Sequence, residues 1–199
     1  MGKYSQAGQD DWLVDYFWGR TGVAVDVGAN DGKFFSNTLR LEELGWYVLC
    51  IEPNPMNHAA LIRNRKHVAL FGVMDYDGTA DLVVGADQHG PTLPGSSITP
   101  YDSETYNVLE RFPVPVRTLN TLLDEAGITG PIDFLAMDME GGEAHALRGL
   151  DLDRYAPRLI TVEDNHPPKP ALPECRAILE GRYREVHRIL DDVFFERVT

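Results

Sequence analysis

Short, continuous apolar runs separated by helical patterns are the feature that most constrains the fold of this chain. The runs cover residues 23–27, 46–51, 67–73, 132–137 and 159–162. Runs of this length without alternation are typical of strands buried on both faces, and helices between them favour parallel pairing. The pattern therefore predicts a Rossmann-like α/β sandwich, whose ligands bind beyond the carboxyl ends of its strands.

The remaining segments complete the predicted order of elements. Helical periodicity covers residues 9–18, 35–44, 56–65, 143–150 and 173–180, and Thr118 is expected to cap a helix through residue 126. A turn at residues 75–78 precedes a short strand at 80–84, and residues 185–190 and 193–198 form two closing strands. Residues 85–105, rich in Gly, Pro and Ser, are expected to form a loop that acts as a substrate lid.

Composition narrows the class of protein. The 199 residues suit one domain, and 31 acidic against 18 basic side chains give a net charge of −13, which opposes binding to nucleic acid. No apolar run reaches the roughly 18 residues of a membrane span, and the first residues do not resemble a signal peptide. Cys50 and Cys175 lie far apart without metal-ligand spacing. We expect a soluble, single-domain, cytoplasmic protein with no membrane partner.

The first apolar run leads into a glycine-containing turn. It reads Val25-Asp26-Val27-Gly28-Ala29-Asn30-Asp31-Gly32, which lacks the third glycine of a dinucleotide fingerprint. Glycines allow close backbone approach, and the helix start that follows offers free N–H donors. This pattern suits an adenosyl amino acid without a diphosphate, with Asp26 or Asp31 meeting its ammonium group. A tight turn without any ligand is the alternative.

The second run ends at Glu52, 26 positions after Asp26. An acidic residue at about this spacing accepts hydrogen bonds from the ribose hydroxyls of an adenosine. The alternative is a solvated carboxylate at the end of a strand.

Acidic residues also follow the fourth and fifth runs, as Asp138-Met139-Glu140-Gly141-Gly142-Glu143 and Glu163-Asp164-Asn165-His166. Carboxylates this close raise one another's pKa, so they hold protons or bind a cation. Three interpretations stay open. The oxygens bind Mg²⁺ or Ca²⁺, Glu140 or His166 acts as a general base, or Glu140 and Glu143 only favour a helix N-terminus.

These motifs together resemble the FkbM-type methyltransferases, S-adenosylmethionine-dependent enzymes mostly associated with O-methylation. The matching segments follow the family order: residues 5–10, 25–32, 36–38, 41–42, 51–55, 64–65, 133–143 and 162–165. The resemblance implies a class I methyltransferase fold, with a mostly parallel seven-stranded sheet and helices on both faces.

The resemblance also assigns residues to the cofactor. Asp26, Gly28, Asn30 and Gly32 would surround its methionine part, with Ser36 and Asn37 beside them, Glu52 at the ribose, and Phe71 and Gly72 near the adenine. Ala29, Pro53 and Asp138 would also belong to the cofactor site. Residues 1–20, through Ser5 and Gln6, would fold over the cofactor, and Asp138 and Glu140 would face the transferred methyl group. Related metal-dependent sugar O-methyltransferases place Mg²⁺ ligands at the positions of Asp138, Glu163 and Asp164. Strand alternation, however, puts Glu163 and Asn165 on one face and Asp164 on the other.

The expected activity is therefore methyl transfer to a hydroxyl of a small molecule such as a sugar or polyketide. A carboxylate base, His166 or a bound divalent metal would assist the transfer. Acceptor recognition would come from residues 85–105 and the C-terminal strands, or from a second subunit of a homo-oligomer. The missing third glycine argues against a nicotinamide oxidoreductase, and the carboxylate cluster argues against a non-catalytic binding module.

Overall fold

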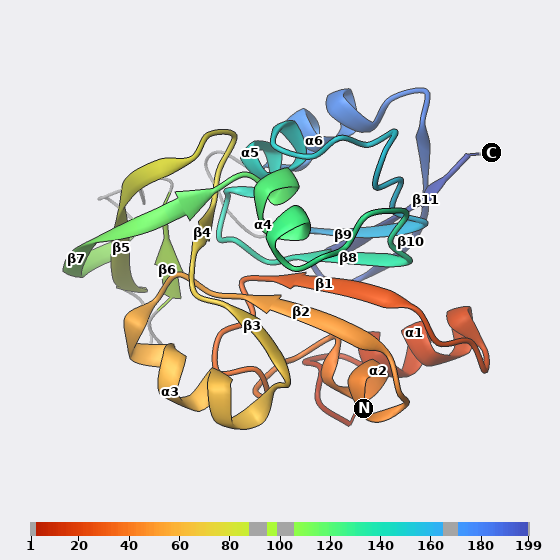
Figure 1. The fold of residues 1–199 in the computed structure, drawn as a ribbon, viewed down its shortest axis with the longest axis horizontal. Coiled ribbons are helices and arrows are strands. Elements are labelled where there is room, and N and C mark those ends of the chain that lie inside the picture. The colour runs from red at the N-terminus through yellow and green to blue at the C-terminus, as the bar shows by residue number, and fades with distance from the viewer. Residues whose placement is uncertain (1–2, 88–94, 99–105, 165–170, 199) are drawn as a thin grey trace.

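The computed structural model describes residues 3–87, 95–98, 106–164 and 171–198. A seven-stranded sheet in the order β10-β11-β9-β8-β1-β2-β3 crosses the molecule (Figure 1). Its strands are β1 (Val23–Val27), β2 (Tyr47–Ile51), β3 (His67–Ala69), β8 (Phe134–Met137), β9 (Leu159–Glu163), β10 (Tyr183–Ile189) and β11 (Asp192–Arg197). All pairs are parallel except those of β11, which runs antiparallel to both β9 and β10. The predicted class I methyltransferase fold is confirmed.

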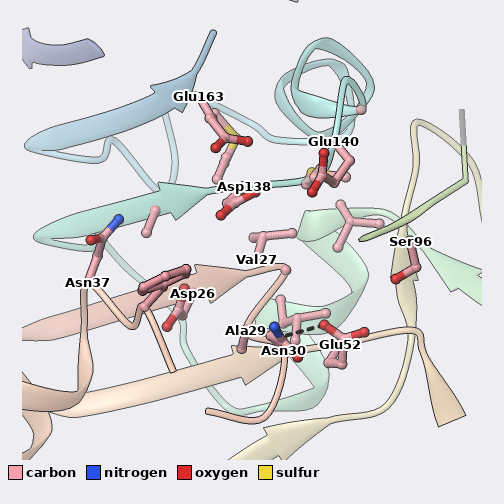
Figure 2. A pocket seen from close by; sticks show the side chains of 18 of the residues that line it. Asp26, Val27, Ala29, Asn30, Asn37, Glu52, Ser96, Asp138, Glu140 and Glu163 are labelled. Atoms are coloured by element: carbon pink, nitrogen blue, oxygen red, sulfur yellow. Dashed lines mark hydrogen bonds between the residues drawn. The ribbon is translucent and has the colours of Figure 1, made fainter. Parts of the chain in front are cut away.

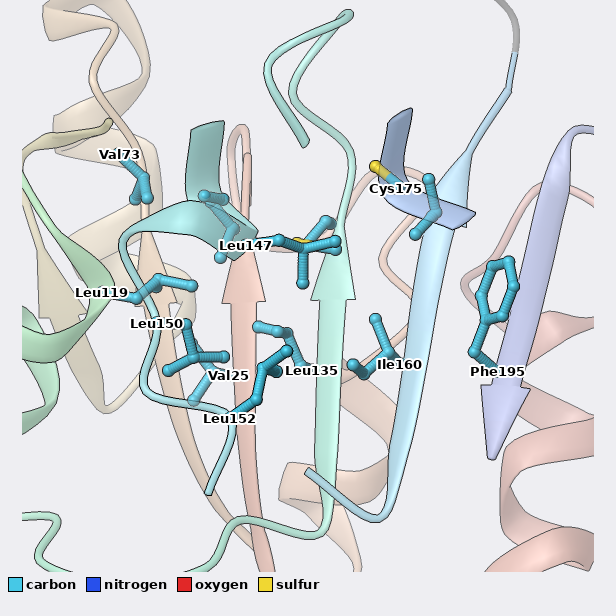
Figure 3. Close-up of a cluster of buried hydrophobic side chains, with 14 of the residues drawn as sticks. Val25, Val73, Leu119, Leu135, Leu147, Leu150, Leu152, Ile160, Cys175 and Phe195 are labelled. Atoms are coloured by element: carbon cyan, nitrogen blue, oxygen red, sulfur yellow. The ribbon is translucent and has the colours of Figure 1, made fainter. Parts of the chain in front are cut away.

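Helices cover both faces of this sheet (Figure 1). One face packs against α1 (Gln9–Phe17), α2 (Leu39–Glu43) and α3 (Pro55–Asn64), and the other against α4 (Leu119–Glu125), α5 (Glu143–Arg148) and α6 (Leu172–Leu179). Because successive strand residues point to opposite faces, Val25 packs with Leu135 and Ile160 on the α4–α6 side (Figure 3). Ala24 lies on the α1–α3 side, and the same alternation sends Asp26 there.

A second sheet, which the sequence did not predict, lies beside the first. It has the order β4-β7-β5-β6, with β4 (Gly72–Val73), β5 (Gly78–Asp87), β6 (Gly95–Ser97) and β7 (Tyr106–Arg117). Leu82, Val114 and Val116 form its small core. The prediction of one strand over residues 67–73 is wrong, because the chain leaves the main sheet after Ala69 and joins the second at Gly72.

Part of the expected lid also belongs to this second sheet. Residues 85–87 continue β5, and residues 95–97 form β6, which pairs with β5 between Val83 and Gly85. Residues 88–94 and 99–105 of the expected loop lie outside the described residues.

Two helix starts show how local hydrogen bonds set the element boundaries. Thr118 caps α4 as predicted, since its hydroxyl accepts a hydrogen bond from the Thr121 N–H at 3.1 Å. The helix predicted from residue 35, by contrast, begins at Leu39. The Ser36 hydroxyl accepts hydrogen bonds from the N–H groups of Thr38 (3.2 Å) and Leu39 (3.0 Å), which hold residues 36–38 in a turn before α2.

The lengths of the helices and the burial of the two cysteines bear on the expectations drawn from composition. Within the ranges described above, no helix has the length and apolar character needed to cross a bilayer. Cys50 and Cys175 are both buried thiols, and they belong to the cores on opposite faces of the sheet.

Candidate active site

A cleft of about 360 Å³ opens at the carboxyl ends of the parallel strands. It lies where the strand order reverses between β1 and β8, as expected for ligand sites in open α/β sheets. The predicted site residues that line it are Gln6, Asp26, Gly28, Ala29, Asn30, Ser36, Asn37, Glu52, Pro53, Phe71, Asp138, Glu140 and Glu163. Ser5, Gly32, Gly72 and Asp164 lie outside this lining. His166 is outside the described residues.

Glu52 organises one half of the cleft, at the end of β2. Its Oε2 accepts a hydrogen bond from the Asn30 N–H at 2.8 Å (Figure 2). Its Oε1 accepts one from the Asn54 N–H, also at 2.8 Å. Burial raises the pKa of Glu52, while these backbone donors favour its charged form. The carboxylate is therefore held in one place and ties the loop after β1 to the end of β2.

The first glycine of the loop is explained by protein packing. Gly28 has φ of 84°, and a Cβ there would lie 1.8 Å from the carbonyl oxygen of Asp138. The N–H groups of Gly28 and Ala29 both donate to the Ile51 carbonyl, at 3.0 and 3.1 Å. Gly28 is thus required because the ends of β1 and β8 come together at the base of the cleft.

The two carboxylates predicted to meet an ammonium group both have partners within the protein. Asp26 accepts a short hydrogen bond from the Thr38 hydroxyl, and its Oδ2 lies 3.6 Å from Arg65 Nη1. Burial raises the pKa of Asp26, and the charge of Arg65 opposes that rise. Asp31 Oδ1 accepts from the N–H groups of Lys33 (2.8 Å) and Phe34 (2.7 Å), so it stabilises the loop turn.

Carboxylates gather in the other half of the cleft, at the ends of β8 and β9 (Figure 2). Asp138 opens into the cleft and is hydrogen-bonded to Glu163, which is half-buried. Limited hydration in the cleft raises the pKa of both groups, and their mutual repulsion raises that of Glu163 further. The two carboxylates therefore titrate as a pair, and both favour the protonated form more than an isolated carboxylate does.

Glu140 stands on a constrained turn beside this pair. Its φ of 55° lies in the left-handed region, and Gly141 follows with φ of 96°. The carbonyl oxygen of Glu140 accepts a hydrogen bond from the Ser97 hydroxyl of β6 at 3.0 Å. Strained non-glycine residues of this kind concentrate at functional sites. Glu143 supports the turn from inside, since its Oε1 accepts from the Met139 N–H at 2.8 Å.

Sequence reasoning missed Asp192, the first residue of β11. The antiparallel register places Asp192 opposite Glu163, and its carboxylate accepts a hydrogen bond from Gln9 Nε2 at 2.7 Å. Burial raises the pKa of Asp192 to about 6. The available signal was the pair Asp191-Asp192 between the two predicted closing strands, because that hairpin turns at the same edge of the sheet.

Of the three predicted magnesium ligands, the structure brings Asp138 and Glu163 into the cleft but not Asp164. Asp164 accepts a hydrogen bond from Arg188 Nη2 at 3.2 Å and does not line the cleft. Asp138 and Glu163 are instead hydrogen-bonded to each other. No group of three or more His, Cys, Asp or Glu side chains in the described ranges is arranged to hold a metal ion.

The strand order and the position of the cleft, at the ends of β1, β2 and β8, are typical of the Rossmann-like class I methyltransferase fold. Comparison with protein families places the chain more narrowly, since the Methyltransferase FkbM domain matches residues 26–187. The chain belongs to the FkbM methyltransferase family and is an S-adenosylmethionine-dependent methyltransferase. The family resemblance of the sequence motifs is thereby confirmed.

Two solved structures are similar to this chain, and the first supports the fold. A putative rRNA-methylase from Clostridium thermocellum has a TM-score of 0.55 at 11% identity, and the match covers 100% of this chain and 98% of that one. A SAM-dependent methyltransferase from Aquifex aeolicus has a TM-score of 0.45 at 15% identity, over 95% of this chain and 89% of that one. A comparison with curated proteins finds no match.

Proposed function

We propose that this methyltransferase transfers the methyl group to a hydroxyl of a small molecule, with Glu140 as the general base. One observation carries the proposal: Asp138, Glu140 and Glu163 line the same cleft as the Glu52 anchor, at the neighbouring strand ends. Carboxylates accept hydrogen bonds from hydroxyls and accept their protons. None of the described lining residues is Lys, Arg or His, so the cleft favours neutral, polyhydroxylated acceptors over anionic ones.

Cofactor binding is assigned to the half of the cleft around β1 and β2. Glu52 would accept hydrogen bonds from the ribose hydroxyls. Each of its oxygens has a lone pair that the N–H groups of Asn30 and Asn54 do not occupy. Phe71, which lines the cleft after β3, would pack against the adenine. The acidic lining matches the net positive charge of S-adenosylmethionine, which supplies an activated methyl group on a sulfonium.

The protein's own contribution to the reaction is positioning and proton removal. The hydrogen-bonded pair Asp138–Glu163 would orient the acceptor hydroxyl. Glu140 would take the hydroxyl proton as the new carbon–oxygen bond forms and the methyl–sulfur bond breaks, with S-adenosylhomocysteine as the leaving group. No step in this scheme requires a metal. His166 remains the alternative base predicted from the sequence.

The segments around the cleft are proposed to cover its ligands. Gln6 and Gln9 line the cleft from the N-terminal segment, and Ser96 and Ile98 line it from the second sheet. These contacts support the expected roles of residues 1–20 as a cofactor cover and of residues 85–105 as an acceptor lid. A homo-oligomer that completes the acceptor site stays an alternative. A cytoplasmic location stays a prediction from the sequence.

The test is to incubate the enzyme with S-adenosylmethionine that carries a ¹³C-labelled methyl group. The acceptors are a panel of neutral sugars and polyketide alcohols, and products are read by mass spectrometry and NMR. The proposal expects a labelled methyl ether that requires Glu140. Labelled methyl on nitrogen or carbon, or transfer only to anionic acceptors, would contradict it.

A further inference from the structure

Arg65 lies beneath the loop that lines the cofactor half of the cleft, and none of the roles assigned above involves it. It follows α3, and its side chain is fully buried. It does not line the cleft. Its guanidinium donates to Glu42 Oε2 (2.8 Å), the Gly32 carbonyl (3.2 Å), Ser36 Oγ (3.2 Å) and Thr38 Oγ1 (2.8 Å), and lies 3.6 Å from Asp26 Oδ2.

These partners span the whole turn from the end of β1 to α2. Arg65 therefore connects strand, loop and helix through one rigid group. The planar guanidinium offers donors in a fixed fork, which a lysine ammonium does not reproduce. Two buried carboxylates, Asp26 and Glu42, also depend on this one cation. Removal of one partner from a buried charge cluster leaves the remaining charges buried and unpaired, which is strongly destabilising. The conformation of the loop therefore depends on all of these contacts together.

The second glycine of the loop carries independent information. Gly32 has φ of 78°, and a Cβ at this position would lie 2.5 Å from Arg65 Cγ and 2.8 Å from Leu61 Cδ1. Gly32 does not line the cleft. The glycine is required because the stem of Arg65 passes directly against the loop backbone, on the side away from the cleft.

We propose that Arg65 is a positioning residue for S-adenosylmethionine. It holds residues 28–38 in the conformation in which Asn30 and Asn37 line the cleft, and it acts without touching the cofactor. Ser36, Thr38 and Glu42, which belong to the matching family segments, all contact this guanidinium. The inference does not depend on the identity of the methyl acceptor.

The test compares Arg65→Lys with Arg63→Lys, a matched control on the exposed surface of α3. Calorimetric titration with S-adenosylhomocysteine measures the Kd, and hydrogen exchange measures the local order of the loop. We expect about tenfold or greater weakening for Arg65→Lys, with faster exchange confined to residues 28–38. Arg63→Lys should match the wild type. A folded Arg65→Lys variant with a Kd within twofold of wild type would overturn the proposal.

A second variant keeps the test decisive if Arg65→Lys fails to fold. Thr38→Val preserves shape and removes the hydroxyl that links Asp26 to Arg65. We expect an intermediate loss of affinity, about threefold to tenfold, in a folded protein whose Tm falls by a few degrees, because two buried hydrogen bonds are lost. Wild-type affinity in a folded Thr38→Val protein would overturn the proposal. Because these variants are read by cofactor binding, their outcome is separate from that of the hydroxyl-transfer assay.

Discussion

The carboxylates in the two halves of the cleft differ in their hydrogen-bond and ion-pair partners. At the ends of β1 and β2, Asp26 is paired with Arg65 and Thr38, and Glu52 accepts two backbone N–H groups. At the ends of β8 and β9, Asp138 and Glu163 are hydrogen-bonded to each other, and the pKa of each is raised. In the cofactor half, at the ends of β1 and β2, each carboxylate is held in place by partners within the protein. In the acceptor half, at the ends of β8 and β9, the carboxylates point into the cleft.

This difference indicates how the two halves divide the work. A binding site gains from groups whose positions are fixed before the ligand arrives, because little ordering remains to be done. A proton-transfer site needs groups that can change protonation state during the reaction. Variants in the cofactor half should therefore change binding, and variants in the acceptor half should change turnover or the response to pH.

The largest expected effect is on turnover. Glu140→Gln keeps the shape of the proposed base and removes its ability to accept a proton, so kcat should fall about 100-fold or more. The Kd for S-adenosylhomocysteine should stay within twofold of wild type. Glu180→Gln, at the exposed end of α6, is the control. A near-normal rate for Glu140→Gln at saturating substrate would remove Glu140 from the mechanism.

Glu52→Gln should affect binding instead. The amide keeps one acceptor oxygen, so one charge-assisted contact to the loop is lost, at a cost of about 2 kcal/mol or roughly a 30-fold weaker Kd. Titration with S-adenosylhomocysteine measures this, and Glu110→Gln on β7 is the exposed control. If kcat at saturating S-adenosylmethionine falls as strongly as the affinity, the proposed division between the halves is wrong.

Asp192 predicts a pH-dependent effect on stability. Its pKa is raised to about 6 in the folded protein, so the folded state holds the proton more tightly than the unfolded chain. Its favourable contribution is full below about pH 4 and is lost as pH rises through about 6. Urea unfolding should show Asp192→Asn gaining about 2 kcal/mol relative to wild type between pH 4 and pH 7. A pH-independent difference between the two proteins would contradict this.

The smallest expected effect links the second sheet to catalysis. Ser97→Ala removes the hydrogen bond to the Glu140 carbonyl, a contact worth about 1 kcal/mol, so kcat should fall about fivefold. Cofactor affinity should be unchanged, and Thr79→Ala on β5 serves as the control. Full kcat in Ser97→Ala would show that β6 does not position the Glu140 turn.

The sequence predicts the central strands and their ends because physical burial leaves a direct pattern. β1, β2, β8 and β9 are covered on both faces, so they are continuous apolar runs, and the residues that follow them must meet at one edge. That reasoning located Glu52, Asp138 and Glu163 in the cleft. It could not locate β7, where Pro113 and Pro115 interrupt the strand pattern. Proline is tolerated there because β4 pairs with β7 only at the last two residues of β7, so that β5 alone of the described strands pairs with β7 at the prolines.

Contacts between distant segments explain what else the sequence did not reveal. Arg65 reaches Asp26 and Thr38 from the far end of α3, and no periodicity reports that proximity. Asp192 meets Glu163 only because β11 inserts antiparallel beside β9. The role of Gly32 was likewise hidden, since the side chain that requires a glycine comes from a helix in another part of the sequence.

The most direct test of the account is calorimetric titration with S-adenosylhomocysteine, in Mg²⁺ buffer and again after chelation. The account predicts micromolar binding with the same Kd under both conditions, because the half of the cleft assigned to the cofactor is built from Glu52 and backbone donors. Absence of binding under both conditions, or binding that requires Mg²⁺, would contradict it.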